Sequence, residues 1–123
     1  MTRLVMAASA VVMIVAGLAC TFAPQELLAR IGASSFPPVA VQLAGSLFLG
    51  FAMINWMARD SLIGGIYNRP VAAGNLLHFS SAAIALLKAQ WWIPAALYAI
   101  FAIAFAKIVF TSPVRRGDAP ASP

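Results

Sequence analysis

The stretch LVMAASAVVMIVAGLACTF, residues 4–22, decides the fold class, because it is almost wholly apolar and contains no charged side chain. A helix needs about 20 mainly apolar residues to cross the hydrocarbon core of a bilayer. Three more stretches have this character: VAVQLAGSLFLGFAMINWMA (39–58), PVAAGNLLHFSSAAIALL (70–87) and WWIPAALYAIFAIAFAKIVF (91–110). Their apolar runs lack the alternation of barrel strands, so we expect an all-α protein with four transmembrane helices.

The composition favours lipid as the solvent. The chain has 123 residues, of which 63% are hydrophobic and 9% are charged, whereas a soluble domain is about 45–50% apolar and about 25% charged. The basic residues are scattered at segment ends without an aromatic–basic motif, so we expect no nucleic-acid partner. The single cysteine, Cys20, excludes an internal disulfide.

The connection between the first two stretches, residues 23–38, is too polar to cross a membrane. Leu27, Leu28 and Ile31 recur there at helical spacing, which predicts a short helix over residues 25–32 that lies at the membrane interface.

The remaining connections predict turns over residues 59–69 and 88–90. Residues 113–123 have the composition of a disordered segment. We therefore expect one membrane domain over residues 1–112, followed by a disordered cytoplasmic tail.

The distribution of basic residues predicts the orientation. Cytoplasmic loops of membrane proteins carry an excess of Lys and Arg. With four crossings, one side of the membrane holds Arg30 and Lys88, and the other holds both termini. We expect both termini to be cytoplasmic, because the richer side carries Arg3, Arg59, Arg69, Lys107, Arg115 and Arg116.

The first stretch has a second interpretation as a cleaved signal. It has a basic start, and the sequence GLAC at residues 17–20 suggests a lipoprotein cleavage site at Cys20. However, Gly17 stands where a large aliphatic residue is expected, and the apolar run is longer than a usual signal core. A transmembrane helix is the favoured interpretation.

Each predicted span has one line of mainly small or polar residues with a period of about 3.5 residues, which predicts an antiparallel left-handed four-helix bundle. Small residues on such lines allow helix backbones to approach closely in lipid. The four lines are Ser9, Met13, Ala16 and Cys20; Gln42, Ser46, Gly50 and Met53; Gly74, His78, Ser81 and Ala85; and Ala95, Ala99, Ala102 and Ala106.

Three polar side chains within the spans form a candidate site. Asn55 stands near the end of the second span, and Asn75 and the single histidine, His78, stand near the start of the third. Ser9 is expected at a similar depth. Polar groups inside a membrane are candidate functional residues, so the three side chains could line a cavity that opens to the cytoplasm. A histidine that hydrogen-bonds a neighbouring helix is a sufficient explanation of His78 and the favoured one.

The chemistry of catalysis is missing from the spans. The acidic residues Glu26, Asp60 and Asp118 all fall in loops or in the tail, so the usual acid for proton-coupled transport is lacking. Small multidrug-resistance transporters have a similar length but depend on a glutamate in the first span, which this chain lacks. Phosphate-binding glycine loops and metal-binding HExxH are also absent. We expect no enzyme, cofactor or metal.

Over residues 4–110 the chain resembles the small four-helix bacterial inner-membrane proteins of unassigned function, in span number, short loops and basic ends. The resemblance implies a location in a bacterial inner membrane. We expect a non-enzymatic protein that contacts the bilayer and packs with itself or with a larger membrane complex. The alternatives are a small-solute or ion transporter or pore component that uses Asn55, Asn75 and His78, and a membrane enzyme acting on lipid-like substrates.

Overall fold

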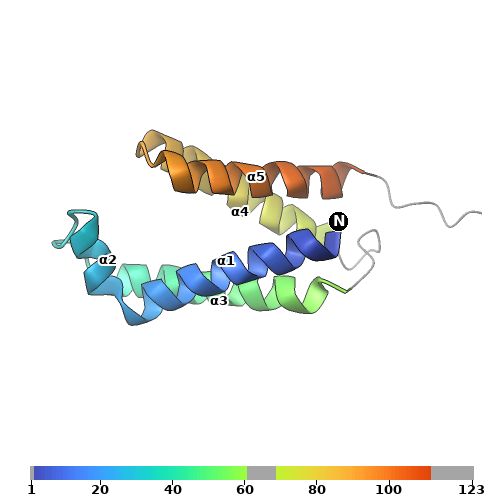
Figure 1. Cartoon of the computed structure of the whole chain (residues 1–123). Coiled ribbons are helices and arrows are strands. Elements are labelled where there is room, and N and C mark those ends of the chain that lie inside the picture. Colours follow the sequence, from blue (N-terminus) through green and yellow to red (C-terminus); the bar gives the residue numbers. More distant parts are fainter. Residues whose placement is uncertain (1, 61–68, 112–123) are drawn as a thin grey trace, which may run out of the picture. The chain divides into compact units, whose positions relative to one another are not determined.

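The computed structural model describes residues 2–60 and 69–111 (Figure 1). These residues form helices and no strand, so the all-α prediction is confirmed within them. The predicted tail and most of the predicted turn at 59–69 lie outside the described residues. The helices are α1 (Thr2–Phe22), α2 (Pro24–Arg30), α3 (Pro38–Ala58), α4 (Arg69–Lys88) and α5 (Trp92–Phe110).

Four of the helices, α1, α3, α4 and α5, are each long and apolar enough to cross a membrane. Their ends fall within two residues of the four predicted stretches. The short α2 lies where a helix over residues 25–32 is predicted, although it begins one residue and ends two residues earlier. Its location at a membrane interface stays a prediction. Proline at the first position begins α2 and α3, where its missing N–H leaves no hydrogen bond unmade and its fixed φ suits the helix.

Two of the helices end in the same backbone motif. After α2, Gly32 has a φ of 71°, the N–H of Ala33 donates to the Leu28 carbonyl at 2.8 Å, and the N–H of Gly32 donates to the Ala29 carbonyl at 3.2 Å. This pair of hydrogen bonds is a Schellman motif, which satisfies the last carbonyls of a helix and requires a left-handed residue.

The end of α4 repeats the motif with a different residue at its centre. The N–H of Trp91 donates to the Leu86 carbonyl, and that of Gln90 donates to the Leu87 carbonyl, both at 3.0 Å. Gln90 has a φ of 62°, a conformation that costs an L-residue about 1–2 kcal/mol. The chain therefore reverses direction between α4 and α5 at a strained glutamine. The corresponding position after α2 is a glycine, which adopts this conformation without strain.

The chain divides into two compact units, one with α1, α2 and α3 and the other with α4 and α5, and each is described by itself. In the first unit α1 and α3 run in opposite directions, because Ser9 contacts Asn55 while Thr21 contacts Gln42. In the second unit α4 and α5 also run in opposite directions after their short connection (Figure 1).

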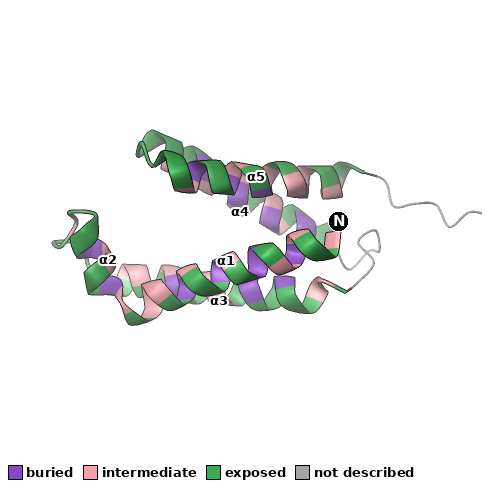
Figure 2. Cartoon of the chain, viewed as in Figure 1, coloured by how far each residue is buried: buried purple, intermediate pink, exposed green. Residues whose placement is uncertain are grey.

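The buried faces of the helices differ from the predicted lines (Figure 2). The line on α1 is correct at Ser9 and Met13, which are buried, whereas Ala16 and Cys20 are half-buried. The line on α3 is wrong, because its four residues, Gln42, Ser46, Gly50 and Met53, are all exposed. The face of α3 that is buried instead carries Gly45, Ala52 and Asn55.

The predicted lines on α4 and α5 are correct only in part, because five of their residues are half-buried: Gly74, His78, Ala99, Ala102 and Ala106. On α4, Ser81 and Ala85 are exposed, whereas Ala72, Asn75, Phe79 and Ala83 are buried. On α5, Ala95 is buried as predicted, but the other buried residues are Tyr98, Phe101 and Phe105. The reason is volume, since aromatic rings fill the space between these two helices and leave the alanines beside them.

Candidate functional site

Asn55 is the polar centre of the contact between α1 and α3. Its side chain is fully buried, and its Nδ2 donates to Ser9 Oγ at 3.0 Å and lies 3.8 Å from Met13 Sδ. Ser9 in turn donates to the Met6 carbonyl at 2.9 Å. The prediction that Ser9 and Asn55 lie at a similar depth is therefore confirmed, and the amide of Asn55 is used in joining two helices.

The backbones of α1 and α3 approach closely toward the other end of the same helix pair. A Cβ added at Gly45 of α3 would lie 2.6 Å from Thr21 Oγ1 and 2.9 Å from the Gly17 carbonyl oxygen of α1. A Cβ added at Gly17 would lie 3.0 Å from the Gly45 carbonyl oxygen. Real Cβ atoms essentially never come within 3.0 Å of such atoms. The two glycines therefore mark the place where the helices meet backbone to backbone, as small residues allow in membranes.

Asn75 is also fully buried, on α4. Its Nδ2 donates to the carbonyl of Val71, one turn earlier in the same helix, at 2.9 Å. A side chain that bonds to the preceding turn satisfies part of its polarity without a second helix. This hydrogen bond holds the amide against its own helix.

His78 lies beside a group of aromatic rings that joins α4 to α5. Its ring centroid is 5.2 Å from that of Phe79 and 5.8 Å from that of Tyr98. Phe79 has no exposed surface. Its centroid lies 5.1 Å from that of Tyr98, 4.9 Å from that of Phe101 and 5.6 Å from that of Phe105. These separations are in the range that aromatic pairs favour.

The structure brings two of the three predicted site residues together on one helix. Asn75 and His78 are three residues apart on α4, and Asn75 is buried while His78 is half-buried. Asn55 belongs to the other unit, so its predicted convergence with Asn75 and His78 stays a prediction.

Sequence reasoning did not identify Gly45 or Phe79, which are buried where the helices of their units meet. A glycine within an apolar helix is a known sign of close packing in membranes, but Gly50 and Gly74 carry the same sign. Gly50 is exposed, with no atom within 4 Å of an added Cβ. Phe79 follows His78 in the sequence, and the prediction is based on the single histidine rather than on one of several phenylalanines.

The end of α3 carries a polar cap for its unit. Arg59 Nη1 donates to the Trp56 carbonyl at 2.6 Å, and the guanidinium carbon lies 4.0 Å from the centroid of the Trp56 ring. Such stacking is worth about 0.5–1 kcal/mol at exposed sites. It places a cation and an amphipathic ring together at the end of a long apolar helix, as is typical of membrane interfaces.

Within the described residues no group of three or more His, Cys, Asp or Glu side chains lies close enough together to hold a metal ion. No protein-family model, curated protein or solved structure matches the chain. The interpretation of the site therefore depends on its own contacts. Those described above join one helix to another, or a side chain to its own helix.

Proposed function

We propose that the chain is an integral membrane protein of a bacterial inner membrane, with both termini in the cytoplasm and four spans in an antiparallel left-handed bundle. It acts without catalysis, as a helix-packing or accessory subunit. Support comes from four helices of sufficient length and apolarity, and from large apolar side chains on their outer surfaces, such as Ile93, Phe110 and Leu4, which are 87%, 80% and 74% exposed.

The observation that supports the proposal most directly is the hydrogen bonding of the two buried asparagine amides. The side chain of Asn55 donates to Ser9, and that of Asn75 donates to its own helix. In a membrane, polar side chains that bond across helices hold the helices together. A solute site needs polar groups that face an aqueous cavity, whereas these two are fully buried and hydrogen-bonded to protein.

The test is reconstitution of the purified chain into liposomes. Alkaline carbonate extraction of cell membranes first establishes whether the chain is integral, and release into the soluble fraction would contradict the proposal. Solute flux is then compared between loaded and protein-free liposomes. We expect equal flux, together with a defined oligomer or complex after cross-linking in the native membrane.

A transporter or pore component is the second candidate, because two asparagines and a histidine lie within apolar helices and intramembrane polar groups are functional candidates by default. This candidate predicts flux above that of protein-free liposomes, and loss of that flux in His78→Leu while insertion is retained. Ser81→Ala is the matched control, since Ser81 is exposed on the same helix and donates to carbonyls of that helix. The packing proposal predicts no flux in any of these proteins.

A further inference from the structure

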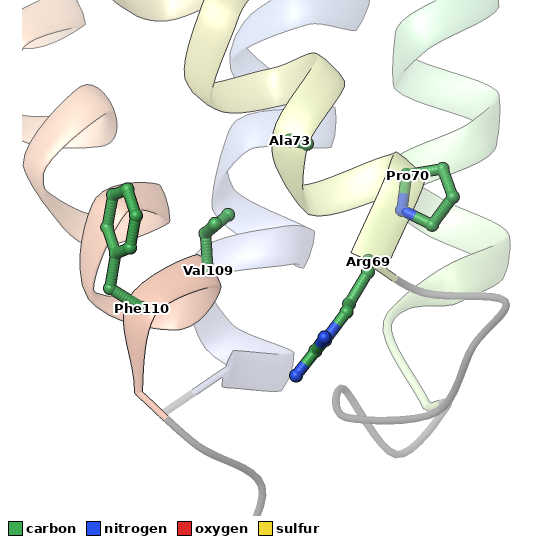
Figure 3. A pocket seen from close by; sticks show the side chains of 5 residues that line it. All are labelled: Arg69, Pro70, Ala73, Val109 and Phe110. Carbon is green, nitrogen blue, oxygen red and sulfur yellow. The ribbon is translucent and has the colours of Figure 1, made fainter.

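A pocket of about 580 Å³ opens between the beginning of α4 and the end of α5 (Figure 3). Among the described residues, its walls are Pro70 and Ala73 on α4 and Val109 and Phe110 on α5, and Arg69 is the one charged residue of this lining. Arg69 extends from the first turn of α4 beside the last turn of α5 (Figure 3). One guanidinium thus stands at a pocket whose other walls are apolar.

The chemistry of the pocket matches an amphipathic anion. A guanidinium binds a phosphate through two parallel N–H···O hydrogen bonds, while the apolar walls offer contact to a hydrocarbon chain. Lys107 lies three residues before Phe110, near the same end of α5, and adds a second positive charge there. A free inorganic anion would gain nothing from Ala73, Val109 and Phe110. The pocket therefore favours a ligand that has both an anionic group and a hydrocarbon chain.

We infer that this pocket binds one anionic phospholipid, with its phosphate on Arg69 and the start of an acyl chain against Pro70, Ala73, Val109 and Phe110. The inference rests on the proposed integration into a membrane and names the lipid class that the protein selects. In the proposed topology, the ends of both helices meet the cytoplasmic interface, where anionic lipids gather and attract basic side chains.

The experiment is native mass spectrometry of the detergent-purified chain with added phosphatidylglycerol or phosphatidylcholine. We expect one phosphatidylglycerol to be retained in preference to phosphatidylcholine. Arg69→Gln should weaken retention about fivefold, the change expected for one basic side chain near anionic lipid. Arg69→Lys should weaken it less, because it keeps the charge but loses the bidentate contact. Lys88→Gln is the matched control, because it removes one charge from the opposite end of the same helix.

A second variant tests the pocket apart from the charge. Ala73 is exposed within it, so Ala73→Phe should fill the space and lower retention while leaving Arg69 in place. Equal losses in Arg69→Gln and Lys88→Gln, or unchanged retention in Ala73→Phe, would overturn the pocket. If the chain resists carbonate extraction yet binds both lipids equally, this inference fails and membrane integration stands; if the chain is extracted, the proposed function fails first.

Discussion

The two pairs of long helices pack by opposite means. Between α1 and α3 the contact is made by small groups, with Gly17 and Gly45 backbone to backbone and the Ser9–Asn55 hydrogen bond nearer one end. Between α4 and α5 it is made by large groups, with Phe79 among three aromatic rings of α5. At the Gly17–Gly45 contact the first pair has no room for another carbon atom, whereas the second pair depends on rings that fill the space.

In the proposed membrane location, this difference follows from the driving forces for helix association that lipid leaves available. Apolar side chains gain little by leaving acyl chains for protein, so helix association in a bilayer depends on close packing and on polar contacts. Glycines achieve it by bringing backbones together, and rings achieve it by their contact area and their preferred mutual geometry. The two pairs should therefore respond in opposite ways to a change in side-chain volume.

Truncation of Phe79 should have the largest effect. Phe79→Ala removes the contacts of Phe79 with three aromatic rings of α5. At about 1 kcal/mol each, we expect a loss of about 3 kcal/mol in the free energy of unfolding. The loss is measured by SDS titration of the detergent-solubilised chain, followed by circular dichroism. Phe22→Ala is the control, because Phe22 is 79% exposed and its truncation should change little. Equal effects of the two variants would show that the rings do not hold α4 to α5.

Enlargement of Gly45 should break the other pair. In Gly45→Ala the new methyl group would meet backbone of α1. Overpacking costs about 1–3 kcal/mol and the gain in helix propensity returns up to about 1 kcal/mol, so we expect a net loss of about 1–2 kcal/mol. Gly50→Ala makes the same chemical change on the exposed face and should be neutral or stabilising. The same titration reports both, and a Gly45→Ala variant as stable as Gly50→Ala would contradict the close crossing.

The two Schellman motifs offer a smaller test. Gln90→Gly removes a left-handed L-residue from the turn after α4 and should stabilise the chain by about 1 kcal/mol. Gly32→Ala introduces the same strain after α2 and should destabilise it by a similar amount. Thermal unfolding in detergent measures both shifts. Shifts of the same sign would mean that φ at these positions does not control the stability of the turns.

The Ser9–Asn55 hydrogen bond should have the smallest effect. A double-mutant cycle of Ser9→Ala and Asn55→Ala measures its coupling energy, and comparable bonds within membranes average about 0.6 kcal/mol. A coupling energy near zero would mean that the Gly17–Gly45 contact stabilises the α1–α3 pair without help from this hydrogen bond. A value well above about 1.7 kcal/mol, the largest found for such bonds, would make the asparagine the main determinant of this pair.

The sequence is sufficient to predict where the long helices begin and end, but not which of their faces are buried. Hydropathy alone predicts the ends of α1, α3, α4 and α5 within two residues, because the cost of unsatisfied backbone groups in lipid leaves few alternatives to a helix. The buried faces depend on which partner each helix meets. On α4 the predicted line includes His78, yet Phe79, the next residue, is the one with no exposed surface.

The candidate site shows the same limit. The rarity of polar residues in the spans singles out Asn55 and Asn75, and both side chains are fully buried. Their role as a functional site stays a prediction. Rarity does not say what an amide bonds to, because a partner one turn away on the same helix and one on a neighbouring helix produce the same pattern in sequence. The hydrogen bonds to Ser9 and to Val71 required coordinates.

The glycine crossing has a practical consequence for observing this protein at work. Cys20, the single cysteine of the chain, is half-buried on α1, and its Cβ would lie 2.9 Å from a Cβ placed on Gly45. We expect a thiol reagent to reach Cys20 faster when α1 and α3 separate at this point. The rate of alkylation in native membranes is therefore a gauge of helix separation that needs no engineered label, and it can be read in living cells.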